Sequence, residues 1–315
     1  MVTPFILDCD TGRDDALAIW YALLNDLPLK AVVASYGNTP RANVVANCRN
    51  VLAAFADKNI PVFEGAAAAL RAHSYTDKIV TPRQEASGNG LCNIQLPYDG
   101  QTVDLAVEDD FAALWAFIQS ASEQHGSKID YIITGPATNF ARLIEIYGAD
   151  AVKAHIGKVV MMGGKFDALW ARLPFADFNI GADPFAVKAI MEAGIQINFV
   201  PMNSTWPIAV ALDVIEGFAP KMDLAQQVKD IMIAHCREFS PEPIFRFHDP
   251  AVMLVVEDDC AFTHRHLDII TDDRADDFGR LVAQDNAGYF CGVFQISDAQ
   301  IIDFEKRLLT ILGLS

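Results

Sequence analysis

The sequence lacks paired cysteines, long apolar runs and an excess of positive charge, and each absence excludes a class of protein. Its six cysteines include no CxxC pair, so we expect buried thiols in a reducing cytoplasm and neither a disulfide framework nor a zinc site. No uninterrupted apolar run approaches the roughly 18 to 20 residues of a membrane span. The N-terminus has no basic region followed by a small-residue cleavage site. These absences predict a cytoplasmic protein with no membrane partner.

Basic residues are fewer than acidic residues. The 315 residues include 24 Lys and Arg against 41 Asp and Glu, which gives a net charge of −17. Phosphate backbones and anionic lipids would repel such a chain, so we expect no nucleic-acid partner. With 52% hydrophobic residues the chain can bury a sizeable core. The surplus of carboxylates is compatible with a cation site.

Short apolar runs rich in Val and Ile alternate with longer amphipathic stretches such as Asp14–Leu24. Runs that are apolar at nearly every position are typical of strands covered on both faces. The sequence therefore predicts an α/β fold, a single domain over residues 1–315 with a mainly parallel central sheet flanked by helices. The predicted strands are Phe5–Asp8, Ala31–Ser35, Pro61–Phe63, Tyr131–Thr134, Val159–Met162, Ile197–Val200, Leu267–Ile270 and Phe290–Ile296.

Two long stretches, residues 71–109 and 218–248, interrupt this alternation. Loops of this length in a compact domain are usually functional, so we expect loop or helical insertions that border the active site. The last helix has a clear start, because Ser297 and Gln300 form a capping-box pattern.

An acidic cluster follows the first predicted strand and consists of Asp8, Asp10, Asp14 and Asp15, with Gly12 among them. Residues two apart on a strand share a face, and the carboxyl ends of parallel strands are where open α/β sheets bind ligands. Complementing a helix dipole would account for two of these carboxylates but not for four. Four carboxylates this close repel one another unless a cation lies among them, and oxygen ligands favour Ca²⁺ or Mg²⁺.

A phosphotransferase reading of the same cluster is weaker. Haloacid-dehalogenase-like enzymes carry DxDxT at a strand end and phosphorylate the first Asp. This chain has Gly12 where that pattern requires Thr, and it adds Asp14 and Asp15.

Further polar motifs follow later strands. Taken singly, each is an ordinary turn or helix cap, as Asp249-Pro250 illustrates. Together they follow successive strand ends in the order Gly37-Asn38, Thr134 to Asn139, Met161-Met162-Gly163-Gly164, Asp177-Phe178-Asn179 and His248-Asp249-Pro250.

With these motifs the sequence resembles the inosine–uridine-type nucleoside hydrolase family, from about residue 4 to the C-terminal helix. The family's opening DxDxGxDD is matched in full, and the later motifs keep their order. The resemblance implies a compact α/β fold, a tightly held Ca²⁺, and a homodimer or homotetramer. It also implies purine or pyrimidine salvage, with a small-molecule ribonucleoside as substrate.

The resemblance also implies roles for individual residues. The Ca²⁺ ligands would be the carboxylates of Asp10, Asp15 and Asp249 and the backbone carbonyl of Thr134, with Asp8 as a more distant or additional ligand. The substrate would contact Asp14 and Asn38 through its ribose hydroxyls, Asn179 near the ribose ring, Met162 beneath the sugar, and Asp177.

The implied chemistry is hydrolysis of an N-glycosidic bond, which builds positive charge on the ribose. A cation that grips the 2′- and 3′-hydroxyls would fix the sugar and bind the attacking water. Asp10 would take the proton of that water, and His248 would protonate the leaving base. The alternative is a protein that binds ribose or nucleosides at the same site with lost or altered turnover.

The sequence departs from the family pattern on the side of the sugar C5′ and the base. Asp177 stands where the family has Glu. The Asn that helps hold the 5′-hydroxyl has no counterpart between Lys165 and Ala176, a stretch that contains Trp170 and Arg172. The family's HGxxGL loop reads Ala-Ser-Gly-Asn-Gly-Leu over residues 86–91. The motifs for the cation and for the 2′,3′-diol are intact.

Overall fold

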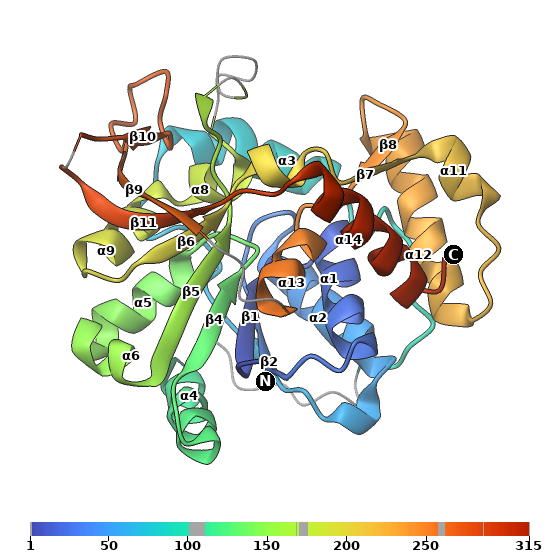
Figure 1. The fold of residues 1–315 in the computed structure, drawn as a ribbon, viewed down its shortest axis with the longest axis horizontal. Coiled ribbons are helices and arrows are strands. Elements are labelled where there is room, and N and C mark those ends of the chain that lie inside the picture. Colours follow the sequence, from blue (N-terminus) through green and yellow to red (C-terminus); the bar gives the residue numbers. More distant parts are fainter. Residues whose placement is uncertain are drawn as a thin grey trace.

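The computed structural model describes residues 2–100, 111–167, 169, 176–257, 262–285 and 287–314. Figure 1 shows a central sheet with helices on both of its faces. The strands are β1 (Phe5–Cys9), β2 (Leu29–Ala34), β3 (Val62–Glu64), β4 (Ile129–Ile133), β5 (Ile156–Met162), β6 (Ile197–Val200), β7 (Ala209–Ala211), β8 (Ile244–Arg246), β9 (Phe262–Ile269), β10 (Leu281–Ala283) and β11 (Tyr289–Phe294).

The main sheet has nine strands among the described residues, in the order β10-β9-β11-β6-β5-β4-β1-β2-β3. The strands from β11 to β3 pair in parallel, whereas β9 runs antiparallel to both β10 and β11. The predicted α/β fold with a mainly parallel sheet is confirmed, and each of the eight predicted runs overlaps a strand of this sheet. Strands β7 and β8 form a separate antiparallel pair that was not predicted.

The helices cover both faces of the sheet. They are α1 (Arg13–Leu24), α2 (Arg41–Ala53), α3 (Thr81–Ala86), α4 (Phe111–His125), α5 (Thr138–Tyr147), α6 (Ala149–His155), α8 (Phe178–Ala182), α9 (Pro184–Glu192), α10 (Met202–Thr205), α11 (Leu212–Gly217), α12 (Asp223–Ala234), α13 (Pro250–Glu257) and α14 (Asp298–Ile311). Short 3₁₀ or π turns are η1 (Ala56–Lys58), η2 (Thr76–Val80) and η4 (His235–Phe239).

Two apolar cores result from this layering. Side chains of α1, α2, α13 and α14 pack on one face of the sheet, and those of α4, α5, α6 and α9 on the other. In β1 the alternation is direct, because Leu7 belongs to the first core and Ile6 to the second. In Figure 1 the blue helices α1 and α2 and the green helices α5 and α6 lie on opposite sides of the sheet.

The two interrupting stretches contain short helices. Residues 71–109 include η2 and α3, and residues 218–248 include α12, η4 and β8. The capping box of the last helix is confirmed, since the Ser297 side chain accepts from the Gln300 backbone and Gln300 reaches back. No helix in the described part of the chain is long and apolar enough to cross a membrane. The cysteines of the described segments, at positions 9, 48, 92, 236 and 291, are free and buried, as expected.

Candidate functional site

The carboxyl ends of four adjacent strands carry the predicted site residues. Strands β2, β1, β4 and β5 are neighbours in that order, and their ends lead to Asn38, Asp10, Thr134 and Met162 respectively. A cavity of about 400 Å³ opens above them. Its walls are Asp14, Asn38, Tyr75, Ile79, Arg83, Thr134, Met162, Ala176, Asp177, Phe178, Asn179, Met202, His248 and Asp249.

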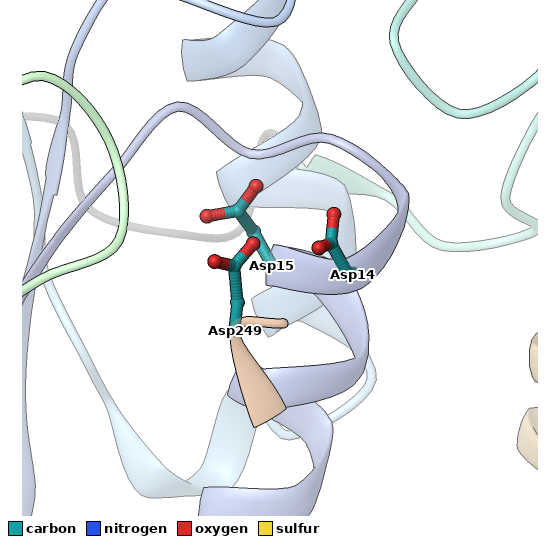
Figure 2. Close-up of side chains that lie close together, drawn as sticks. All are labelled: Asp14, Asp15 and Asp249. Atoms are coloured by element: carbon teal, nitrogen blue, oxygen red, sulfur yellow. The ribbon is translucent and has the colours of Figure 1, made fainter. Parts of the chain in front are cut away.

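Three carboxylates meet on the floor of this cavity. Figure 2 shows Asp14 and Asp15 at the start of α1, with the carboxylate of Asp249 directed toward that of Asp15 from the start of α13. One oxygen of each lies within 4.8 Å of the others. Asp15 is held firmly, because Oδ2 accepts from the Gly12 backbone N–H at 2.9 Å and Oδ1 from the Thr134 hydroxyl at 2.8 Å. These bonds fix the position of the carboxylate before any ligand binds.

Asp10 is fully buried, interacts with the charges of Asp15 and Asp14, and has one oxygen unpaired. Its Oδ2 accepts from the backbone N–H of Asn38 at 2.6 Å, whereas Oδ1 is buried with no hydrogen-bond partner. The backbone at Gly37 is what allows this approach, since a Cβ there would lie 2.1 Å from Asp10 Oδ2. A buried carboxylate oxygen without a donor is costly unless a proton or a cation satisfies it.

The pKa values of these carboxyl groups reflect their burial and their mutual repulsion. Burial raises the pKa of Asp15 to about 7, and the charge of Asp14 adds to the shift. Burial also raises the pKa values of Asp10 and Asp249 well above the usual range, and neighbouring carboxylates reinforce both shifts. A divalent cation would relieve these repulsions, and an all-oxygen donor set suits Ca²⁺ or Mg²⁺. The residues therefore fit a hard cation.

Asp8 occupies a different place from the other carboxylates. It is fully buried within β1, where Oδ1 accepts from Asn139 Nδ2 at 2.8 Å and Oδ2 from the Tyr131 hydroxyl at 3.0 Å. Burial raises its pKa to about 7, and these two hydrogen bonds act in the opposite direction. Both oxygens are thus engaged away from the cavity.

Asn179 connects two strand ends. Its Nδ2 donates to the carbonyl of Thr134 at 2.7 Å and to that of Met162 at 3.1 Å. Because the amide nitrogen is engaged with the backbone, the oxygen of Asn179 is the atom left for a ligand. Thr134, Met162 and Asn179 all line the cavity, where the sequence motifs predicted substrate or cation contacts.

Asp177 shapes the wall next to Asn179. It caps α8, accepting from the Ile180 backbone at 3.2 Å, and it accepts from the Gly164 backbone at 2.7 Å. Burial raises its pKa, which these hydrogen bonds and the charge of Lys165 oppose. Burial lowers the pKa of Lys165 to about 8. The Asp in place of Glu therefore holds the Gly-Gly turn while it borders the cavity. Trp170 and Arg172 lie outside the described residues.

His248 stands at the other end of the cavity, next to Asp249. Its Nδ1 lies 2.7 Å from the hydroxyl of Thr205, so Nε2 is the ring nitrogen left for a ligand. Burial lowers the pKa of His248, and the charge of Asp14 opposes the shift. The imidazole is therefore mostly neutral at pH 7.

Several cavity residues were not identified from the sequence. They are Tyr75, Ile79, Arg83, Ala176, Phe178 and Met202. Met202 follows β6, so the strand-end reasoning could have found it. Tyr75, Ile79 and Arg83 enter from η2 and α3, where no strand end indicates which side chains face inward.

Comparison with known proteins gives one family. A model described as inosine-uridine preferring nucleoside hydrolase matches residues 5–301. The pyrimidine-specific ribonucleoside hydrolase RihA of Salmonella paratyphi A is 29% identical over 220 residues, which cover 69% of this chain and 66% of that protein. Its namesake from Klebsiella pneumoniae is 28% identical over 262 residues, covering 80% and 79%.

Solved structures share the fold. The plant nucleoside hydrolase PpNRh1 superposes with a TM-score of 0.77 at 22% identity, covering 100% of both chains. A purine-preferring ribonucleoside hydrolase from Gardnerella vaginalis superposes with a TM-score of 0.76 at 20% identity, covering 99% of this chain and 100% of the other.

Proposed function

We propose, on the premise that this chain belongs to the inosine-uridine preferring nucleoside hydrolase family, that it hydrolyses the N-glycosidic bond of a ribonucleoside to free base and ribose. The observation that carries this proposal is the floor of the cavity. There the carboxylates of Asp14, Asp15 and Asp249 converge, and the buried Asp10, which interacts with the charges of Asp14 and Asp15, keeps one oxygen without a hydrogen-bond partner. This arrangement suits a cation that must hold both a sugar diol and a water.

The cation we propose is Ca²⁺, held by the carboxylates of Asp10, Asp15 and Asp249 and by the carbonyl of Thr134. When bound, it would lower the pKa of a coordinated water and anchor the ribose hydroxyls. Asp14 is the least buried of the cluster, and its carboxylate lines the cavity. It would accept a hydrogen bond from a ribose hydroxyl.

Asp10 is the proposed general base. Its Oδ2 is already occupied by the N–H of Asn38, so Oδ1 is the oxygen that can contact the cation and the attacking water. A carboxylate whose pKa is raised by burial accepts a proton more readily than an exposed one. Water then attacks C1′ as the bond to the base breaks, and the departing base carries the electron pair of that bond.

Of the two alternatives, phosphoryl transfer fits the geometry less well. It would need a nucleophilic Asp8, but both oxygens of Asp8 accept hydrogen bonds and the residue is fully buried. A binding protein that holds the same cation would use the unpaired oxygen of Asp10 in the same way, so turnover is the property that separates it from a hydrolase.

A substrate panel separates these classes. The Ca²⁺-loaded protein is incubated with purine and pyrimidine ribonucleosides and assayed for reducing sugar, then with phosphate esters and assayed for phosphate. Ribose release supports the proposal. Phosphate release without ribose, or nucleoside binding without either product, would contradict it.

His248 is expected to protonate the leaving base. Its replacement by Ala should slow ordinary nucleosides far more than p-nitrophenyl riboside, whose leaving group departs without a proton. General acids contribute about 10²- to 10⁴-fold, so the contrast between the two substrates should be easy to measure. The measurement is kcat/KM for both substrates. An equal loss on both would indicate damage to the neighbouring Asp249 and would remove the acid role.

Calcium should stabilise the protein more at high pH than at low pH. The raised pKa values of Asp10, Asp15 and Asp249 mean that the metal-free folded state binds more protons than the unfolded state between about pH 4 and 7. Its stability therefore falls as pH rises through this window, and Ca²⁺ would offset the loss. We expect saturating Ca²⁺ to raise Tm by about 5 to 10 °C at pH 8 and by much less at pH 5.5.

Thermal unfolding with Ca²⁺ or with a chelator at both pH values tests this expectation. Asp249→Asn should abolish the increment, and Asp150→Asn, at the exposed start of α6, should keep it. Equal increments at the two pH values would contradict the assignment.

The cytoplasmic location and the homodimer or homotetramer remain predictions.

A further inference from the structure

We propose that Arg83 is a positioning residue that makes Asn38 a hydrogen-bond donor to the ribose, an inference that rests on the proposed ribonucleoside site. Arg83 lies on α3, in the long interrupting stretch, and its guanidinium lines the cavity. No motif of the sequence identified it. Its two contacts join the strand-end residue Asn38 to Phe178 on α8.

The contact with Asn38 is a two-pronged hydrogen bond. Arg83 donates to Asn38 Oδ1 from Nε at 3.1 Å and from the terminal Nη2 at 2.7 Å. An amide oxygen has two lone pairs, so these two donors use its accepting capacity. On the other side of the amide, Asn38 Nδ2 donates to Asp15 Oδ2 at 3.4 Å.

This pairing fixes which way the amide faces. A flipped Asn38 would place its NH₂ group against the N–H donors of Arg83 and its oxygen against the carboxylate of Asp15, so both contacts would become repulsive. The bonds from the guanidinium are charge-assisted and are therefore the stronger restraint. With Oδ1 occupied and one Nδ2 hydrogen directed to Asp15, the remaining Nδ2 hydrogen is what Asn38 can offer to a ligand.

The hydrogen-bonding groups of Asp14 and Asn38 together are complementary to a pair of sugar hydroxyls. Asp14, as a carboxylate, can only accept hydrogen bonds, and Asn38 as fixed by Arg83 can only donate them. A sugar hydroxyl needs an acceptor for its proton and a donor for its oxygen. The two residues line the same cavity and would supply one of each.

The second contact keeps Arg83 itself in place. The guanidinium carbon lies 4.0 Å from the centre of the Phe178 ring, which is a close cation–π arrangement. The backbone carbonyl of Asn38 also accepts from the Ser87 hydroxyl at 2.7 Å, so the end of α3 and the Asn38 turn are joined twice. The Asn38 amide and the Phe178 ring are both neutral. Arg83 therefore acts on these two direct partners by orienting them.

A double-mutant cycle tests the inference, using Arg83→Met, Asn38→Ala and the double variant, all Ca²⁺-loaded. We measure kcat and KM for a ribonucleoside and the affinity for D-ribose. Arg83→Met should raise KM and weaken ribose binding about tenfold, with a smaller change in kcat, because a ground-state contact is lost. In the Asn38→Ala background it should have almost no further effect on KM or on ribose affinity, since the amide that it orients is gone, whereas the charge of Arg83 on Asp10 and His248 acts on kcat. Arg83→Lys should recover part of the loss, because a single ammonium donor can reach Oδ1 but cannot engage it twice.

Arg71→Met is the matched control. Arg71 and Arg83 are both exposed. The guanidinium carbon of Arg71 also makes a cation–π contact, 5.3 Å from the centre of the Phe185 ring, but Arg71 does not line the cavity. The substitution at Arg71 should leave kcat and KM unchanged.

The outcomes distinguish this inference from the proposed function. Additive effects in the cycle, or wild-type behaviour of Arg83→Met, would overturn the role of Arg83 while leaving hydrolysis intact. Ribose binding without turnover would overturn the proposed hydrolysis alone. The double-mutant cycle would then be evaluated from the affinities for D-ribose. A wild-type protein that binds neither ribose nor any ribonucleoside would overturn both.

Discussion

Asp10→Asn is expected to lower kcat by about 10³-fold or more while the chain stays folded. The substitution keeps the shape of the side chain and the acceptor for the Asn38 backbone N–H, which lies 2.6 Å from Oδ2 in the wild type. It replaces the unpaired Oδ1 by an NH₂ group, which can neither take a proton from water nor coordinate a cation. The loss therefore combines the missing base with a weakened cation site. Single-turnover kinetics at saturating substrate and Ca²⁺ measure the effect.

Two controls make this result interpretable. Asp150→Asn removes a carboxylate from the exposed start of α6, which precedes β5 and so lies at the opposite end of the sheet. It should leave kcat unchanged. Calorimetric Ca²⁺ titration of Asp10→Asn shows how much of the loss comes from the cation site. Wild-type turnover in Asp10→Asn would exclude Asp10 from the mechanism.

The parallel part of the sheet could be predicted because its strands are apolar at nearly every position. Phe5–Cys9 and Ile197–Val200 are buried at every position and carry one polar residue each, Asp8 and Asn198, as is typical of strands covered on both faces. Strand β9 was only partly predicted. The part of β9 before Leu267 carries His264, Arg265 and His266 and has no fully buried residue, so its pattern resembles a polar loop. Its antiparallel pairing with β11 supplies the backbone hydrogen bonds that the side chains do not indicate.

Strand-end motifs predicted much of the cavity for the same geometric reason. Residues that follow adjacent parallel strands must meet at one edge of the sheet, which brings Asn38, Thr134 and Met162 together. Asp8 shows the limit of that reasoning. It belongs to the same motif as Asp10, but its side chain is engaged by Asn139 and Tyr131, and nothing in the spacing of the motif reveals those partners.

Arg83 could not be predicted from periodicity. The turn η2 before it is a π-helix, whose register differs from the 3.6-residue period used to assign faces. Its two partners, Asn38 and Phe178, are 45 and 95 positions away in the sequence (83 − 38 and 178 − 83). Only the folded arrangement of α3 over the strand ends brings the three together.

We propose that the acidic cluster at the cavity grips a ribose diol, and removal of one hydroxyl from the substrate probes that grip. Asp14 and the proposed cation would each lose a partner on a 2′-deoxynucleoside, and a site built around a hydroxyl leaves its own polar groups unpaired when that hydroxyl is absent. Such sites reject the analogue by about 10⁴-fold or more.

The measurement is kcat/KM for a ribonucleoside that the substrate panel shows to be active and for its 2′-deoxy counterpart, with the same base and saturating Ca²⁺. A chelator-treated sample serves as the baseline. We expect the ribonucleoside to be cleaved about 10⁴-fold more efficiently, with ribose as the product. Equal efficiency on the two substrates would show that the carboxylate cluster of Asp14, Asp15 and Asp249 does not hold the diol, and would contradict the account.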